Sequence, residues 1–258
     1  MSKKMWSVLA GLCGLGVLAC CSAPSVAQAQ EKPPLYSYVS NWQIPRANWP
    51  EMAKGDSAEQ AMMQKALEDG TLVGYGNDQN LVHQPDGWTH DDWFASTSQA
   101  GILKILAQLY KSPGSTSSVL ASATKHWDLM LISHYYNWKP GASWKSGYVA
   151  VASYKLKKNA PDNAIRMISK DIIAPVMEKL LADGTIVEYE IDTEAVHTSA
   201  PGSFMIVYVC PEADGLDKVD AAVVDSMKTS PLSGPLFGSA VDMSAHRDEI
   251  GFGNGVFK

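Results

Sequence analysis

The chain has 258 residues, of which 46% are hydrophobic and 19% charged, and its formal net charge is −6. This composition is typical of a globular protein and excludes a disordered acidic tail, a collagen-like fibre and a disulfide-rich miniprotein. Since 21 basic residues stand against 27 acidic ones, no nucleic-acid partner is expected.

Residues 1–29 have the layout of a secretory signal peptide. Two lysines precede an apolar run at 9–21, and small residues lead to a cleavage site after Ala29. The run is shorter than the roughly 20 apolar residues that span a bilayer, so no membrane span is expected. The sequence predicts a secreted or periplasmic protein after cleavage near Ala29. The alternative is a lipoprotein attached through Cys20, because Val-Leu-Ala-Cys resembles a lipobox.

Cleavage after Ala29 would leave Cys210 as the single cysteine of the chain. One cysteine can form neither an internal disulfide nor a thiolate zinc site. Because Cys210 ends an apolar strand, we expect a buried and inert thiol.

The first half is predicted to alternate strands and helices. The periodicity of apolar residues and the turn residues between them give, in chain order, a strand at 35–44, a helix at 56–69, strands at 71–77 and 93–97, a helix at 102–109 and a strand at 128–136. Gly70 is expected to end the first helix.

The second half repeats this order. Its predicted elements are a strand at 147–156, a helix at 162–183 kinked by Pro175, strands at 185–191 and 204–210, a helix at 216–227 and a degenerate strand at 249–257.

An internal repeat joins the two halves. Residues 67–83 and 181–197 share nine of 17 residues without a gap, at an offset of 114. Convergent turn chemistry would explain the shared Asp-Gly-Thr, but not the Tyr, Asp, Val and His at matching distances beyond it. We predict a duplication, with a first repeat at 30–140 that includes a linker at 111–124, and a second at 141–258.

The element order in each half resembles the ferredoxin-like unit, and two fused copies resemble the dimeric α+β barrel superfamily. The resemblance covers about 35–257 and rests on element order and duplication. It implies an α+β fold in which two ferredoxin-like βαββαβ units form a pseudo-two-fold α+β barrel. Two four-stranded sheets would pack face to face, with the helices outside.

Histidines and tyrosines recur at matching positions of the repeat. His83 and His197 each lie eight residues after a tyrosine, Tyr75 or Tyr189. A neutral imidazole can act as a general base or bind a metal or haem. The structural alternative is that each histidine closes the turn after its strand, and that each tyrosine packs in the core.

Residues 87–93 concentrate aromatic, imidazole and carboxylate groups. Ligand pockets combine aromatic walls with a few polar groups, so Trp88 and Trp93 could form walls, and His90 with Asp91 an acid–base pair. Packing of these tryptophans at the fused interface is the alternative. The predicted catalytic residues are His83, His90 and Asp91, the predicted ligand-binding residues are Tyr75, Trp88, Trp93, Tyr189 and His197, and no metal-ligand set is predicted.

The resemblance implies several functions, among them cofactor-free monooxygenases, dehydratase- or isomerase-like enzymes, haem-handling proteins and binding modules, and the fold does not choose between them. We predict a secreted barrel that binds a small aromatic or apolar molecule, with histidine-dependent catalysis left open. No cofactor is predicted, with haem or a divalent metal not excluded. The alternative is a non-catalytic envelope protein with a structural or protein-partner role. A weaker one is a haem or metal protein using His83 or His197.

Overall fold

The computed structural model describes residues 31–52, 54, 57–111, 118–198, 201–230 and 233–258. The predicted signal peptide, the cleavage site at Ala29, the alternative anchor at Cys20 and part of the predicted linker lie outside these ranges.

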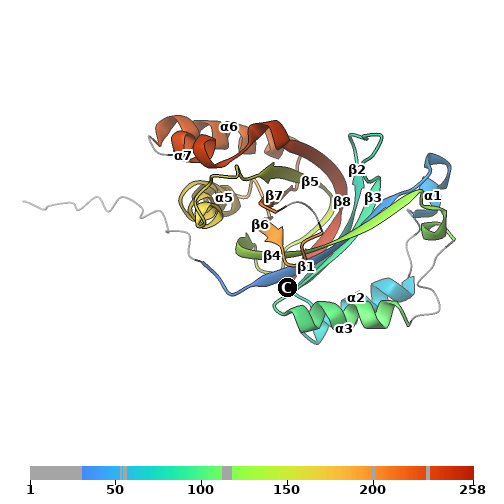
Figure 1. The fold of residues 1–258 in the computed structure, drawn as a ribbon. Coiled ribbons are helices and arrows are strands. Elements are labelled where there is room, and N and C mark those ends of the chain that lie inside the picture. The colour runs from blue at the N-terminus through green and yellow to red at the C-terminus, as the bar shows by residue number, and fades with distance from the viewer. Residues whose placement is uncertain (1–30, 53, 55–56, 112–117, 199–200, 231–232) are drawn as a thin grey trace, which may run out of the picture.

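Eight strands form one closed barrel in which all neighbours are antiparallel (Figure 1). The order around the barrel is β1-β3-β2-β8-β5-β7-β6-β4, and β4 pairs back with β1. The strands are β1 Leu35–Gln43, β2 Gly74–Asn80, β3 His90–Ser96, β4 Lys125–Trp138, β5 Ser143–Lys155, β6 Glu188–Glu194, β7 Ser203–Cys210 and β8 Arg247–Phe257.

This closure corrects the predicted fold class. The prediction of two ferredoxin-like units forming a pseudo-two-fold α+β barrel from two facing sheets is wrong. β2 pairs with β8 from Gly74 opposite Phe257 to Asn80 opposite Gly251, and β4 pairs with β6. A single barrel therefore encloses a single interior, called the lumen below. Closure satisfies the backbone N–H and C=O groups that open sheet edges would leave unpaired.

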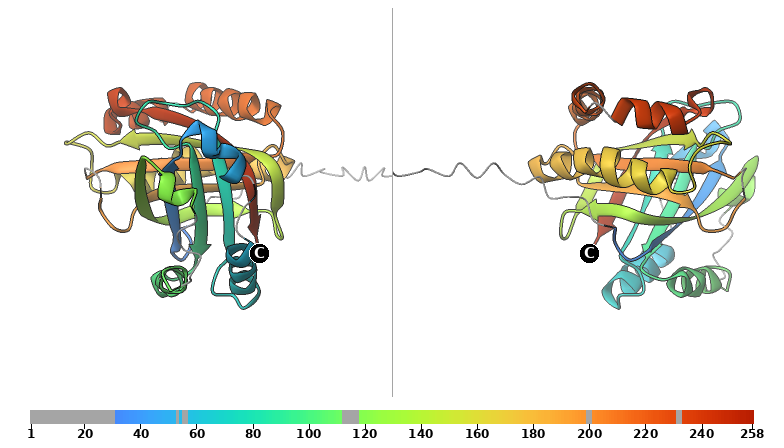
Figure 2. Two further views of the ribbon diagram at one scale, coloured as in Figure 1. Left: turned by 90° about the vertical axis from the view of Figure 1, so that its right-hand side faces the viewer. Right: turned by 60° about the vertical axis from the view of Figure 1, so that its left-hand side comes forward.

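The helices pack outside the barrel (Figure 2). α2 and α3 lie together on one side, while α5, α6 and α7 cover another. The helices are α1 Trp49–Met52, α2 Ser57–Glu68, α3 Gln99–Leu109, α4 Ala164–Ile168, α5 Ala174–Asp183, α6 Asp214–Thr229 and α7 Ser233–Ala240. A π-helical turn, Ser169–Ile173, separates α4 from α5, so the predicted single helix is interrupted just before Pro175. None of the described helices is long and apolar enough to cross a membrane.

Side chains alternate between the helices and the lumen along each strand. On β7, Phe204, Ile206 and Tyr208 belong to the apolar core under α4 to α7. Val207 and Val209, which alternate with them, belong to a separate cluster inside the barrel. The register of neighbouring strands then assigns the inward positions of the whole barrel.

The two repeated segments adopt the same helix–turn–strand geometry. Asp69 and Asp183 each accept a hydrogen bond at 2.9 Å from the backbone N–H of Thr71 or Thr185, and the glycines between them have positive φ. The strands that follow begin at Gly74 and Glu188, later than predicted, because the preceding residues still form the turn. Convergent turns produce the same geometry, so the duplication and its domain boundaries stay predictions.

Candidate functional site

Among the described residues, five buried carboxyl groups point into the middle of the lumen. Asp78 on β2 pairs with Asp91 on β3, and Glu188, Glu190 and Asp192 alternate along β6 opposite the inward residues of β7. All five are between 1% and 8% exposed. We call them the lumen acid cluster. Carboxyl groups are seldom this buried unless another group compensates for the lost hydration.

Hydrogen bonds compensate in part for the burial of these carboxyls, because Asp78 bonds with Asp91 and Trp93, and Glu190 bonds with Asp192. The Ser37 hydroxyl donates to Glu190 Oε2 at 3.0 Å. None of the ion pairs among the described residues includes a member of the cluster. Several buried polar atoms at the inward positions have no hydrogen-bond partner, namely Asn41 Nδ2, Asp78 Oδ1, Asp91 Oδ1, Glu188 Oε1, Asp192 Oδ1 and Trp144 Nε1.

Burial raises the pKa of every member of the lumen acid cluster. The pKa of Asp78 rises to about 7 and that of Glu190 to about 7, mainly because the charged form loses its hydration. The same cause, with repulsion between the carboxylates, raises the pKa of Asp91, Glu188 and Asp192 well above the ordinary range. Asp78 contributes to the shift in the pKa of Glu188, so β2 and β6 interact across the lumen. The cluster therefore retains protons at neutral pH.

Aromatic rings form the other part of the lumen wall. Their centroids follow one another from Tyr136 to Trp138 (5.5 Å), Phe257 (4.5 Å), Trp93 (5.4 Å) and Trp144 (6.0 Å). We call this row the aromatic wall. Glycines of β2 and β8 make room for it: a Cβ at position 76 would lie 2.5 Å from Cζ2 of Trp93.

Parts of the lumen wall are not fully covered by neighbouring side chains. Val39, Trp93, Val151 and Val207 point inward from the middle of their strands, yet each is only half-buried. The strands and the outer helices cover the other sides of these residues, so the exposed part of each side chain faces the lumen. A space with aromatic sides and unpaired polar atoms is the kind of site that holds a ligand or ordered water.

Three of the predicted site residues lie in this lumen. Asp91 belongs to the lumen acid cluster and Trp93 to the aromatic wall. Trp88 is buried, its Nε1 donates to Glu249 Oε2 at 2.9 Å, and its ring contacts the Gly251 position of β8.

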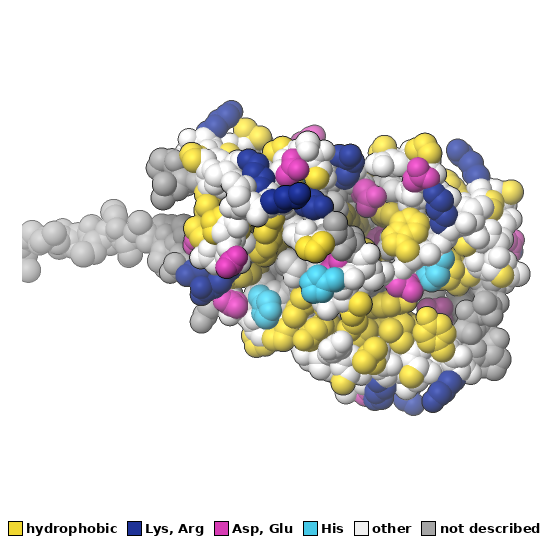
Figure 3. Space-filling view, viewed as in Figure 1, with side chains coloured by type: hydrophobic (Ala, Val, Ile, Leu, Met, Phe, Trp, Pro, Cys, Tyr) yellow, Lys and Arg dark blue, Asp and Glu magenta, His cyan; other side chains and the backbone are white. Residues whose placement is uncertain are grey.

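The predicted catalytic histidines lie on the outer side of the barrel. Trp49 brings them together, with ring centroids 4.9 Å from His83 and 5.4 Å from His90. Burial and the neighbouring His83 lower the pKa of His90 to about 4. His90 does not meet Asp91, because successive strand residues face opposite sides. Histidine side chains are visible at the surface in Figure 3.

The predicted tyrosines and the second repeated histidine also lie outside the lumen. The Tyr75 hydroxyl donates to Gln64 of α2 at 3.0 Å, and the Tyr189 hydroxyl donates to Glu178 of α5 at 2.7 Å. His197 lines a cavity of about 170 Å³, which is smaller than the roughly 300–1,000 Å³ of most ligand pockets.

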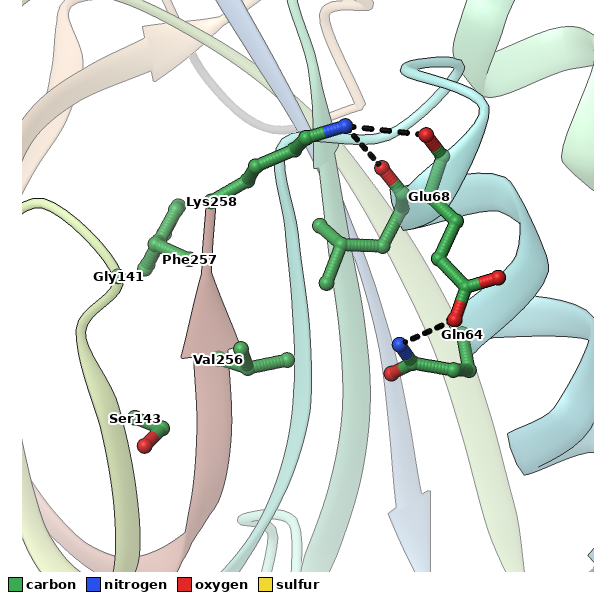
Figure 4. Close-up of a pocket in the computed structure, with 8 residues that line it drawn as sticks. Gln64, Glu68, Gly141, Ser143, Val256, Phe257 and Lys258 are labelled. Atoms are coloured by element: carbon green, nitrogen blue, oxygen red, sulfur yellow. Dashed lines mark hydrogen bonds between the residues drawn. The ribbon is translucent and has the colours of Figure 1, made fainter.

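A larger cavity, of about 410 Å³, lies on the outside near the C-terminus (Figure 4). Lys258 Nζ donates there to the backbone carbonyls of Leu67 and Glu68 at 3.1 and 3.0 Å. Its positive charge therefore interacts favourably with the partial negative charge at the C-terminal end of α2. The residues that line it are Gln64, Leu67, Glu68, Gly141, Ser143, Val256, Phe257 and Lys258. Because none of the unpartnered buried atoms belongs to these residues, the lumen is the stronger candidate site.

The sequence analysis missed most of the lumen acid cluster. Glu188, Glu190 and Asp192 alternate with Tyr189 and Ile191, a pattern that ordinarily places carboxylates in solvent. The available signal was that these residues share a face with the glycines of the first repeat, on the side away from the tyrosines.

No family model and no curated protein matches the chain. Solved structures match the chain in fold. A proposed monooxygenase from Lactobacillus acidophilus is 9% identical, with 86% of this chain and 94% of that chain covered and a TM-score of 0.58. A proposed monooxygenase from Fusobacterium nucleatum is 7% identical, with 89% and 94% covered and a TM-score of 0.51. A haem-binding protein from Thermus thermophilus is 12% identical, with 87% and 94% covered and a TM-score of 0.50.

The haem-binding neighbour contradicts the prediction that no cofactor is involved, since proteins of this fold include one that binds haem. The lumen of this chain does not fit that group. His83, His126 and His197 are exposed, and His90 packs on Trp49. His246 stacks on Tyr154 of the outer core, and His134 Nδ1 contacts the backbone oxygen of Lys32. Among the described residues, no imidazole is therefore placed in the lumen to bind the iron, and the lumen acid cluster supplies no cation to pair with the haem propionates. We derive no step through haem.

These structural neighbours belong to the dimeric α+β barrel superfamily. At such low identity the likeness concerns the fold alone. The chain thus shares its overall fold with these solved structures.

Proposed function

We propose that the protein binds a small organic molecule in the barrel lumen, with an apolar or aromatic part of the molecule against the aromatic wall. One observation carries the proposal: unpartnered, buried polar atoms and the aromatic wall lie together on the inner face of the barrel. A buried polar atom without a partner costs about 1–3 kcal/mol, so a group that hydrogen-bonds to it is favoured.

The structural neighbours support the general part of this proposal. They include proposed monooxygenases and a haem-binding protein, which are proteins that handle small molecules. The described residues place no histidine in the lumen, so the proposal is for binding and assigns no reaction to His83 or His90.

A panel of three indole compounds tests the proposal by isothermal titration calorimetry: tryptamine, tryptophol and indole-3-acetate. We expect at least one to bind with one-to-one stoichiometry. Trp93→Leu should weaken that binding about tenfold, because it removes a ring from the aromatic wall. Trp42→Leu is the matched control, since Trp42 lies on the outer face of β1, stacked on His126 at 3.6 Å. Absence of binding by all three compounds, or equal effects of the two variants, would refute lumen binding.

We further propose that the protein acts outside the cytoplasm. Cell fractionation followed by N-terminal sequencing should find the chain in the periplasm or medium, starting at Gln30. A cytoplasmic chain that retains Met1 would contradict this location. A lipid-modified start at Cys20 would establish the alternative anchor.

A further inference from the structure

The geometry points to an organic cation, a molecule with a protonated amine, as the ligand of the lumen. This inference rests on the proposed function and specifies its ligand class. It follows from where the carboxyl groups lie, from which lumen atoms have no partner, and from what surrounds them.

Carboxyl groups reach the lumen from two sides of the barrel. Asp78 and Asp91 are cross-strand neighbours on β2 and β3, whereas β6 carries the other three. In the order around the barrel, β8, β5 and β7 separate β2 from β6 on one side, so the two groups face each other. An amine with several N–H donors, placed between them, could reach carboxylates of both groups.

Unpartnered atoms outside the acid cluster point to a ligand independently. Asn41 is 4% exposed, its position pairs with Asp91, and its Nδ2 has no partner. Trp144 is 6% exposed, and its Nε1 also has no partner. An uncharged amide left unpaired beside Asp91 indicates that a polar group enters this level of the lumen.

The arrangement favours an organic cation over a metal ion. Among the described residues, no group of three or more His, Cys, Asp or Glu side chains has an arrangement that could hold a metal. The carboxyls are spread along the lumen, whereas a metal ion needs its ligands around one point. The aromatic wall adds contact area for an apolar body, and aromatic faces attract ammonium groups within about 6 Å.

None of the ion pairs among the residues that the structure describes joins a cation to the lumen acid cluster. Within the described residues, one cation lies over a ring of the aromatic wall: Lys32, whose Nζ is 5.0 Å from the Tyr136 ring centre. At the rim, Lys125 pairs with Asp86, and Arg247 donates to backbone carbonyls. A bound amine would therefore be the counter-ion that the buried carboxylates lack.

Amine binding should be coupled to proton release. A bound ammonium favours ionised carboxyls, so it lowers their pKa and displaces protons that the empty lumen holds. Affinity should therefore rise with pH up to the pKa of the amine.

Titratable and charged groups face the lumen from several strands. By strand register, those of the described residues are Asp78 from β2, Asp91 from β3, Tyr136 from β4, Glu188, Glu190 and Asp192 from β6, and Glu249 from β8, with Lys125, Lys155, Glu194 and Arg247 at the strand ends that form the rim. The acids at the middle of the lumen therefore dominate the expected proton release.

The indole compounds distinguish the ligand classes, because they share one ring and differ in side-chain charge. At pH 7.5 tryptamine should bind at least about tenfold more tightly than tryptophol, and indole-3-acetate should bind most weakly. Tryptamine affinity should rise about tenfold between pH 6 and pH 8. Titrations in two buffers of different ionisation enthalpy should show proton release with tryptamine but not with tryptophol.

Variants locate the effect in the lumen acid cluster. Glu190→Gln should weaken tryptamine binding about tenfold and leave tryptophol binding within about threefold. Asp78→Asn, on the opposite wall, provides a second variant with the same expectation. Glu212→Gln, at an exposed position before α6, is the matched control and should change neither affinity.

Each failure has its own meaning. If tryptophol binds as tightly as tryptamine, and both lumen variants leave the affinities unchanged, the amine inference is overturned while lumen binding stands. If Trp93→Leu also leaves every affinity unchanged, the proposed function fails with it. If tryptamine does not bind at all, the ligand class is refuted.

Discussion

Asp78→Asn and Glu190→Gln should raise the melting temperature at pH 8 and leave it nearly unchanged at pH 4. Burial raises the pKa of Asp78 from 3.8 to about 7 and that of Glu190 from 4.5 to about 7. Below pH 4 both groups are protonated in the folded and the unfolded chain. Between about pH 4 and 7 the folded protein keeps protons that the unfolded chain has lost, so its stability falls as pH rises. The amide variants cannot ionise and escape this loss.

Between its unfolded and folded pKa, each group is protonated in the folded chain and ionised in the unfolded chain. In that range it lowers the free energy of unfolding by at most about 1.4 kcal/mol per pH unit. Thermal unfolding of the natural protein and the two variants from pH 4 to pH 8 measures it. The natural protein should lose stability toward pH 8, and each variant should flatten the profile. Asp217→Asn, at an exposed position on α6, should leave the profile unchanged. A natural protein that becomes steadily more stable up to pH 8 would contradict the buried acid cluster.

Exposed carboxylates with a lowered pKa have the opposite effect on stability, which they increase as pH rises. Hydrogen bonds from Thr71 and Thr185 lower the pKa of Asp69 and Asp183 below the ordinary value. The stability that these two aspartates contribute is present above the pKa of the unfolded chain. It is lost as pH falls through the lower pKa of the folded chain. Together with the lumen acid cluster, these groups predict a stability maximum at about pH 4, where the two titration ranges meet.

Local elements could be predicted from the sequence because their causes are local. Gly70 and Gly184 end helices in the left-handed conformation, with φ of 79° and 86°, which glycine adopts without a steric penalty. The apolar run at 204–210 predicted a strand, and β7 lies there. The start of β2 was misplaced because the Asp-Gly-Thr turn consumes residues that have strand propensity.

Closure of the barrel could not be predicted in the same way. It depends on the pairing of β2 with β8 and of β4 with β6, elements that are far apart in the chain. Local alternation shows that a strand has an inner face, but it does not identify the strand that will pair with its edge. The sequence therefore indicated the strands but left the edges open.

The candidate site was predicted only where aromatic residues mark it. Trp88, Trp93 and Asp91 were selected for their concentration near residue 90, and the structure places all three in the lumen. Glu188, Glu190 and Asp192 were missed because carboxylates on one face of a strand ordinarily face solvent. Only closure turns that face inward, so the fold had to be known before the site.

Gly253→Ala should destabilise the barrel where β8 joins β2. A Cβ at position 253 would collide with the Asn77 carbonyl oxygen and with Asp78 Oδ1, and would lie 2.8 Å from the Asp78 Cα. Two of these atoms belong to the backbone of β2, so the strands must separate to admit the methyl group. Overpacking of this kind typically costs about 1–3 kcal/mol, which corresponds to a melting temperature lower by roughly 2–10 °C for a chain of this size.

Gly238→Ala is the matched control, because a Cβ at that position of α7 would meet nothing within 4 Å. Alanine is a better helix former than glycine, so this variant should melt at the same temperature or slightly higher. Equal melting temperatures for both variants would mean that β8 does not lie against β2 as described. A decrease confined to Gly253→Ala would instead locate the strain at the pairing of β8 with β2, which closes the barrel beside Asp78.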